Sequence, residues 1–224
     1  MLGCTEAKSA ETKRANVKPV VFVIDDDSDV REGLRALLES VSLDCETFSS
    51  TSDFLQHRRP DMVSCLVLDV RLPGMSGLDF QQELARQGVG IPIVFLTGHG
   101  DIPMTVRAIK GGAVGFLTKP AREQDLLDAI RAALESDRAR REYEEILHSM
   151  RARFESLSER ERKVMAFVTA GMLNKQIAGA MNLSEVTIKV HRHNLMRKLA
   201  IRTVPDLVRI AETFVENRGP KFPA

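Results

Sequence analysis

The fold of the first half of this chain is decided by the stretch VVFVIDDD, from Val20 to Asp27, in which five apolar residues run directly into three carboxylates. Unbroken β-branched and aromatic runs of this kind are typical of strands that are buried on both faces. A weaker strand covers Cys45 to Phe48, and similar apolar runs end at Asp69, Thr97 and Thr118; each is followed by loop residues and a helical pattern. This alternation predicts five βα units that form a doubly wound, five-stranded parallel sheet.

Polar side chains follow these strands at the ends where ligands bind in such sheets. They are Asp25, Asp26, Asp69, Thr97 and Lys119. Carboxylates are hard oxygen ligands suited to Mg²⁺, and an Asp beside that ion can accept a phosphoryl group. A lysine and a hydroxyl neutralise and position the transferred oxygens. The sequence therefore predicts a phosphoryl-accepting crevice, and we interpret Asp27 and Asp29 as charges at a helix N-terminus.

Length and charge divide the chain in two. Its 224 residues suffice for two modest domains. The net charge of +1 combines −5 for residues 1–136 with +6 for residues 137–224, which favours a metal or regulatory site in the first half and a polyanion partner for the second half.

No apolar run approaches the ~18 residues of a membrane span, and Cys4, Cys45 and Cys65 are too scattered for a disulfide framework. We expect a cytoplasmic protein with no membrane partner.

A charged segment without Gly or Pro joins the two halves, over residues 121–155. It contains Tyr143, Leu147, Met150 and Phe154 at spacings of 4, 3 and 4, which is a helical stripe. The stripe fits pairing with a second copy of the chain and fits packing on its own domain equally well. The pattern also leaves open whether this linker is one continuous helix or a hinge.

From Leu157 onward the pattern is wholly helical. Ser158 and Glu161 form a capping box, and we expect Asn174 and Ser184 to cap the next two helices. Four short helices with a tight corner between the second and third predict a helix-turn-helix bundle.

The third of these helices has two different faces. Ile188, Leu195 and Leu199 share one face and should be buried. The opposite face exposes valines beside basic residues, which suits the major groove of double-stranded DNA. Arg192, Lys198 and the preceding helix start are placed for phosphates. The predicted DNA contacts are Asn174, Lys175, Thr187, Lys189, Val190, Arg192, His193, Arg197 and Lys198.

The motifs of the first half resemble the receiver domain of two-component response regulators. They are Val23–Asp27, Leu68–Gly77, Leu96–Gly98 and Lys119-Pro120. The resemblance implies that Asp69 accepts a phosphoryl group from a sensor histidine kinase, that Thr97 and Lys119 contact that group, and that Phe116 acts with Thr97 as the switch. It also implies a Mg²⁺ held by Asp25, Asp26, Asp69 and the backbone carbonyl of Arg71, and a dimer surface that includes Met104, Ile109 and Lys110.

The second half is similar to the LuxR-type DNA-binding domain, through Leu157–Glu161, Asn174–Ala178 and Ser184–His191. The two halves together resemble the NarL/FixJ class, and the run Gly98–Met104 favours its FixJ branch. The implied organisation is a disordered tail (1–18), a receiver (19–135), a helical linker (136–155), a LuxR-type domain (156–216) and a tail (217–224).

These patterns predict a phosphorylation-activated transcriptional response regulator that forms homodimers on phosphorylation and binds promoter DNA. It is not expected to be an enzyme beyond its own phosphoryl transfer and autodephosphorylation, and RNA polymerase is a candidate further partner. A haloacid-dehalogenase-type phosphatase is a poor match, because Asp29 stands where that family has Thr or Val and Asp69 would have no role. The alternative that stays open is a constitutive, phosphorylation-independent DNA-binding or scaffold regulator.

Overall fold

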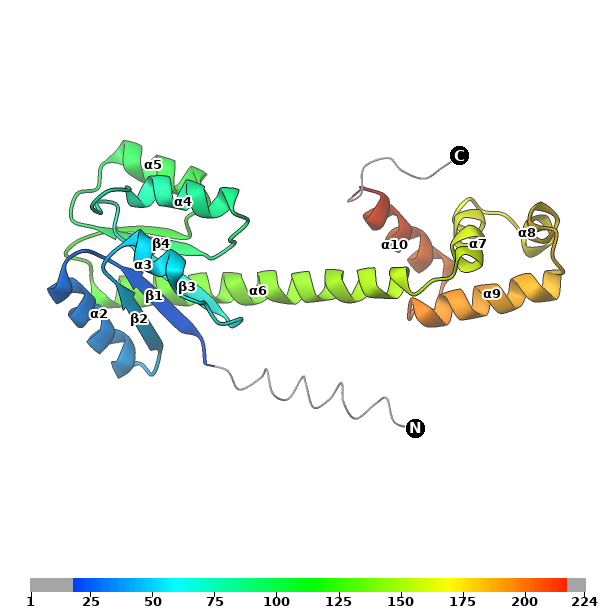
Figure 1. Cartoon of the computed structure of the whole chain (residues 1–224), viewed down its shortest axis with the longest axis horizontal. Helices are drawn as coiled ribbons and strands as arrows, with labels where there is room; N and C mark the ends of the chain where they lie inside the picture. Colours follow the sequence, from blue (N-terminus) through cyan, green and yellow to red (C-terminus); the bar gives the residue numbers. More distant parts are fainter. Residues whose placement is uncertain (1–17, 217–224) are drawn as a thin grey trace. The chain divides into compact units, whose positions relative to one another are not determined.

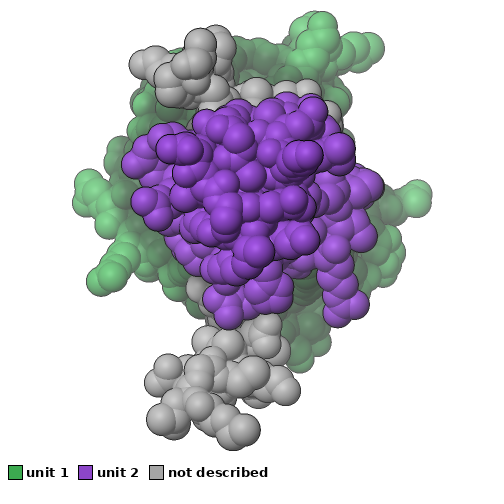
Figure 2. Space-filling model, turned by 90° about the vertical axis from the view of Figure 1, so that its right-hand side faces the viewer, with its two compact units in different colours: residues 1–142 green, residues 143–224 purple. Residues whose placement is uncertain are grey.

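The computed structural model describes residues 18–216, with side chains described through Ala211. The chain divides into two compact units after Glu142 (Figure 2). The tails predicted over 1–18 and 217–224 lie outside the described residues, apart from Lys18.

The first unit is an α/β sheet domain (Figure 1). Its elements are β1 (Val20–Ile24), α2 (Ser28–Ser40), β2 (Asp44–Phe48), α3 (Thr51–Gln56), β3 (Ser64–Leu68), α4 (Gly77–Arg86), β4 (Ile93–Thr97), α5 (Ile102–Lys110), β5 (Gly115–Thr118) and the first part of α6 (Glu123–Glu155). The strands are all parallel, in the order β2-β1-β3-β4-β5. The predicted five-stranded, doubly wound sheet is therefore confirmed.

Both faces of the sheet are covered, which explains why its strands read as continuous apolar runs. Successive residues of β1 alternate between two cores: Phe22 and Ile24 pack under α3, α4 and α5, whereas Val21 and Val23 pack under α2 and α6. Figure 1 shows these helices on opposite sides of the strands. Residues 20–24 pair with residues 64–68 one for one, so the residues that follow the two strands emerge side by side.

Helix α6 is a single helix of 33 residues and includes the whole of the predicted linker, residues 136–155. Asp137 anchors it to the sheet. This carboxylate is fully buried and accepts hydrogen bonds from the backbone N–H of Ser64 (3.0 Å), from Arg140 (2.5 Å) and from Arg141 (2.7 Å). A buried charge needs such partners, so this turn of α6 is fixed at the start of β3.

The second unit contains the end of α6 and four helices, as predicted. They are α7 (Glu159–Thr169), α8 (Asn174–Met181), α9 (Glu185–Lys198) and α10 (Val204–Glu216). Their core includes Val164, Ile177, Ile188, Leu195 and Leu199.

Two of the three helix caps predicted for this unit are present in the structure. The capping box of Ser158 and Glu161 is present, and Ser184 caps α9. The expectation that Asn174 caps α8 is wrong, because Asn174 is the first helical residue and Leu173 holds the cap position. The side chain of Gln176 instead accepts the Leu173 N–H (2.8 Å) and satisfies that backbone donor.

Candidate functional site

Three carboxylates meet at the carboxyl ends of β1 and β3. One oxygen from each of Asp25, Asp26 and Asp69 lies within 4.8 Å of the others. Asp25 and Asp69 are buried, whereas Asp26 is exposed. Such a set of hard oxygen ligands, partly open to water, fits Mg²⁺, which keeps several waters when it binds protein carboxylates.

Lys119, which follows β5, joins two of these acids. Its Nζ donates hydrogen bonds to Asp25 Oδ2 (2.5 Å) and Asp69 Oδ2 (3.0 Å). Burial raises the pKa of Asp25, and the hydrogen bond from Lys119 counters only part of this effect. Burial by itself lowers the pKa of Lys119, but its bonds to Asp25 and Asp69 more than offset burial, so that pKa is raised. Lys119 therefore stays a cation beside both carboxylates.

The loop after β3 fixes the Asp69 carboxylate. The backbone N–H of Arg71 donates to Asp69 Oδ1 (3.0 Å), and the N–H of Gly77 donates to the carbonyl of Val70 (2.9 Å). A Cβ on Gly77 would lie 2.1 Å from the carbonyl oxygen of Asp69, so only glycine allows α4 to start here. Gly77 belongs to the motif Leu68–Gly77, but the motif alone did not indicate this packing role. The signal was a glycine directly after the helix cap Ser76.

Thr97 and Phe116 lie on the neighbouring strands β4 and β5. Thr97 is fully buried, and its Oγ1 accepts a long hydrogen bond from the N–H of His99 (3.5 Å). Phe116 is half-buried, with its ring 5.9 Å from that of Phe95. A Cβ on Gly100 would lie 2.8 Å from the Phe116 ring, so this glycine leaves room for the ring beside the loop after β4.

The predicted dimer residues on α5 fall on two different faces. Met104 is half-buried and packs against the core, whereas Ile109 and Lys110 are exposed. Ile102 and Val106 were not predicted to belong to the dimer surface, although they are 80% and 46% exposed. With Ile109 they form one apolar face at spacings of four and three, which hydrophobic spacing alone could not distinguish from a core-facing stripe.

Helix α9 presents the predicted face to solvent. Ile188, Leu195 and Leu199 are buried, whereas Val186 and Val190 are 70% and 53% exposed. The other exposed side chains predicted to contact DNA are Lys175, Lys189, His193 and Arg197. Thr187 is half-buried, and its hydroxyl lies 2.8 Å from that of Ser184.

Asn174, Arg192 and Lys198, which are predicted DNA contacts, bond to residues of other elements within the unit. Arg192 donates to the side-chain oxygen of Asn174 (2.7 Å), which ties α9 to the start of α8. Lys198 donates to the buried Glu161 (2.7 Å) and to the carbonyl of Ser156 (3.0 Å). The phosphate contact predicted for Lys198 stays a prediction, and within the unit this lysine neutralises a buried carboxylate.

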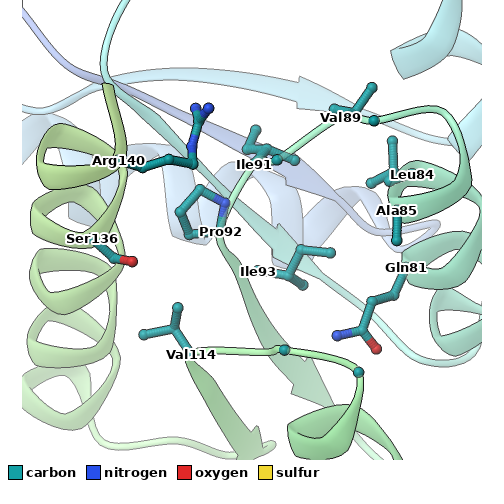
Figure 3. A pocket seen from close by; sticks show the side chains of 14 residues that line it. Gln81, Leu84, Ala85, Val89, Ile91, Pro92, Ile93, Val114, Ser136 and Arg140 are labelled. Carbon is teal, nitrogen blue, oxygen red and sulfur yellow. The ribbon is translucent and has the colours of Figure 1, made fainter. Parts of the chain in front are cut away.

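A second hollow, of about 390 Å³, lies at the opposite end of the sheet, where β4 begins (Figure 3). Most of the lining residues labelled in Figure 3 are apolar, and they include Leu84, Ile91 and Val114. Its one charged lining residue, Arg140, already binds Asp137. None of the predicted site residues lies here.

None of the helices within residues 18–216 is both long enough and apolar enough to cross a membrane.

Models of known protein families match both units of the chain. The response regulator receiver domain model matches residues 21–131, and that of the luxR family of bacterial regulatory proteins matches residues 155–211. Nodulation protein W of Bradyrhizobium diazoefficiens is 53% identical over 199 residues, covering 89% of this chain and 88% of that protein. Response regulator protein TodT of Pseudomonas putida is 50% identical over 193 residues, covering 86% and 85%.

Solved structures of response regulators are similar to this chain over most of its length. The low-resolution structure of response regulator StyR is similar at a TM-score of 0.80 and 53% identity, covering 88% of this chain and 100% of that chain. Full-length FixJ from B. japonicum is similar at a TM-score of 0.54 and 37% identity, covering 88% and 97%.

A doubly wound sheet with an acidic crevice, in one chain with a LuxR-type helical domain, defines a transcriptional response regulator of a two-component system. The chain belongs to the NarL/FixJ family of these regulators.

Proposed function

We propose that this protein is activated by phosphorylation of Asp69 and then binds promoter DNA as a homodimer. The observation that carries the proposal is the joining of Asp25 and Asp69 by Lys119, next to the exposed Asp26. A buried acid pair with one shared cation is costly to build for stability alone, which favours a chemical role.

The phosphoryl donor is a phosphohistidine of a sensor kinase. An Asp69 carboxylate oxygen forms the new bond to phosphorus while the bond from phosphorus to the histidine nitrogen breaks, and the electron pair leaves with that nitrogen. Lys119 and the Thr97 hydroxyl contact the transferred oxygens. Asp25, Asp26, Asp69 and the carbonyl of Arg71 would hold Mg²⁺, which supplies charge neutralisation when bound.

Thr97 and Phe116 form the switch in this proposal. Movement of the buried Thr97 hydroxyl toward the phosphoryl group opens space beside the loop after β4, and the Phe116 ring moves into it. A Cβ on Gly100 would lie 2.8 Å from the Phe116 ring, so the loop packs closely on this ring, and this packing supports the coupling. The loop leads into α5, where Ile109 and Lys110, together with Ile102 and Val106, would meet a second copy; Met104 would support this face from the core.

The DNA-binding surface is assigned to α9. Lys189, Val190, His193 and Arg197 would enter the major groove with Thr187, and Lys175, Asn174 and Arg192 would contact phosphates. We place Lys198 among the residues that support α9, because of its bonds to Glu161 and Ser156. Binding to promoters places the protein in the cytoplasm, with RNA polymerase as a further candidate partner.

DNA selection tests the proposal against the constitutive alternative. Sequences bound by the protein with beryllofluoride and Mg²⁺ are selected from random double-stranded DNA, and the dissociation constant is measured with and without beryllofluoride. We expect at least tenfold tighter binding in its presence for the wild type and no change for Asp69→Asn. Equal affinity in both states would favour a phosphorylation-independent regulator.

A further inference from the structure

We propose that a second copy of this chain docks on α6 in antiparallel orientation, through the linker stripe formed by Tyr143, Ile146, Leu147 and Met150. These residues begin nearly two turns after the Asp137 anchor, where α6 has left the sheet. Tyr143 and Ile146 are 59% and 56% exposed, and Leu147 and Met150 are half-buried. The proposal is independent of the phosphorylation site.

The spacing of the linker stripe is that of a helix–helix contact. At 100° per residue the four side chains occupy one face of α6, with intervals of three, one and three residues. The next apolar residue of this face, Phe154, packs against the core of the second unit. The linker stripe is therefore the part of this helix face that does not pack against the core of the second unit.

The charges beside the linker stripe identify the occupant as another copy. Exposed Glu142 and Glu144 flank its first half on opposite edges, and exposed Arg151 and Arg153 flank its second half in the same way. When two such helices pack face to face and antiparallel, Glu144 of each faces Arg151 of the other, and Glu142 faces Arg153. Parallel pairing in register would instead set Glu144 against Glu142 and Arg151 against Arg153. The charge pattern therefore complements itself in one orientation only.

Such a contact is small. Two helical turns on each partner bury far less than the ~1,200 Å² of a stable interface, so the dimer should be weak and dependent on protein concentration. The linker stripe is thus a second self-association surface, separate from the α5 face proposed above.

Charge reversal in the full-length protein tests the contact by sedimentation over a range of concentrations. Both Glu142→Arg/Glu144→Arg and Arg151→Glu/Arg153→Glu should weaken self-association of the unphosphorylated protein about tenfold, because each turns the four opposite-charge pairs of the dimer into like-charge pairs. An equimolar mixture of the two variants should restore a dimer, which also shows that both remain folded. Unchanged association of the variants, or a wild type that stays monomeric at every concentration, would overturn the proposal.

Tyrosine fluorescence provides a second readout, because Tyr143 is the only tyrosine and the chain has no tryptophan. Quenching of its emission by acrylamide should fall as the concentration rises, in the wild type and equally in Asp69→Asn. Quenching that does not change with concentration would contradict burial of the linker stripe. Loss of the effect in Asp69→Asn alone would contradict its independence of the phosphorylation site.

Discussion

A Cβ atom on Gly77 would lie 2.1 Å from the backbone carbonyl oxygen of Asp69. The first turn of α4 therefore rests directly on the backbone of the proposed phosphoryl acceptor. The Gly77 N–H also binds the carbonyl of Val70, which closes the loop between β3 and α4. The position of the Asp69 carboxylate thus depends on a residue that carries no functional group.

Gly77→Ala should damage the site without touching its chemistry. The added methyl group must push α4 or the end of β3 away, at a cost of about 1–3 kcal/mol in the free energy of unfolding. We also expect a large loss of phosphorylation, measured by intact-protein mass spectrometry after incubation with a phosphoryl donor. Gly33→Ala is the matched control, because Gly33 lies exposed in α2 with nothing within 4 Å of the added atom. It should raise stability by about 0.5–1 kcal/mol and leave phosphorylation unchanged; equal damage by both variants would contradict the packing argument.

Lys198→Ala should destabilise the second unit, because it leaves the buried Glu161 without its cation. We expect a loss of about 1–3 kcal/mol, measured as faster hydrogen exchange of amides in α7 and α9. Lys163→Ala is the matched control. It removes an ion pair of similar length, Lys163 Nζ with Glu159 Oε1 at 2.9 Å, in which both side chains are exposed. This control should leave stability nearly unchanged, because an exposed ion pair is screened by solvent. If the two variants behaved alike, the burial of Glu161 would not be the deciding factor.

The same pair predicts a pH dependence. Burial raises the pKa of Glu161, but hydrogen bonds from Lys198 and Ser158 outweigh burial, so the pKa lies below its ordinary value of 4.5. A carboxyl whose folded-state pKa is lowered stabilises the fold above its unfolded pKa, and this stabilisation is lost as the pH falls through the folded value. The difference in hydrogen exchange between the wild type and Lys198→Ala should therefore shrink below about pH 4.5. A difference that stays constant to lower pH would show that charge does not hold this pair together.

How far the sequence predicts this molecule can be judged from Asp25 and Lys198. Asp25 ends a buried strand, and parallel strands bring such ends to one edge, so topology alone predicts that it meets Asp69. Lys198 was predicted from helix geometry to reach phosphates, but its partner Glu161 comes from another helix. Periodicity along one helix carries no information about what packs against it. The same limit hid the exposed Ile102 and Val106, because an apolar face of α5 has the same spacing whether it faces the core or solvent.

The assignment of α9 to the major groove predicts different losses for different residues. Lys189→Ala and Val190→Ala should weaken binding to a selected DNA site by about 1–3 kcal/mol and leave binding to random DNA nearly unchanged. Arg192→Ala should weaken both, because a phosphate contact carries no sequence information. The measurement is competition binding at one fixed salt concentration. Equal losses on both DNAs for all three variants would refute the assignment.

Ile109→Glu should prevent the phosphorylation-dependent dimer, because a carboxylate in a buried apolar interface is costly to desolvate. Phosphorylation of Asp69 itself should be unchanged, since Ile109 is exposed on α5 and is not among the residues predicted for the phosphoryl-accepting crevice. Sedimentation with beryllofluoride and Mg²⁺, at a concentration too low for association of the unphosphorylated protein, measures the effect. A full dimer in this variant would place the interface elsewhere.

The most direct test of the central claim is the intact mass of the protein after incubation with acetyl phosphate and Mg²⁺. The wild type should gain one phosphoryl group, whereas Asp69→Asn, which keeps the size and shape of the side chain, should gain none. Glu46→Gln, a change at a half-buried acid that pairs with His57 on the edge strand β2, should behave as the wild type. A phosphoryl group on Asp69→Asn, or none on the wild type, would contradict the account of Asp69 as the acceptor.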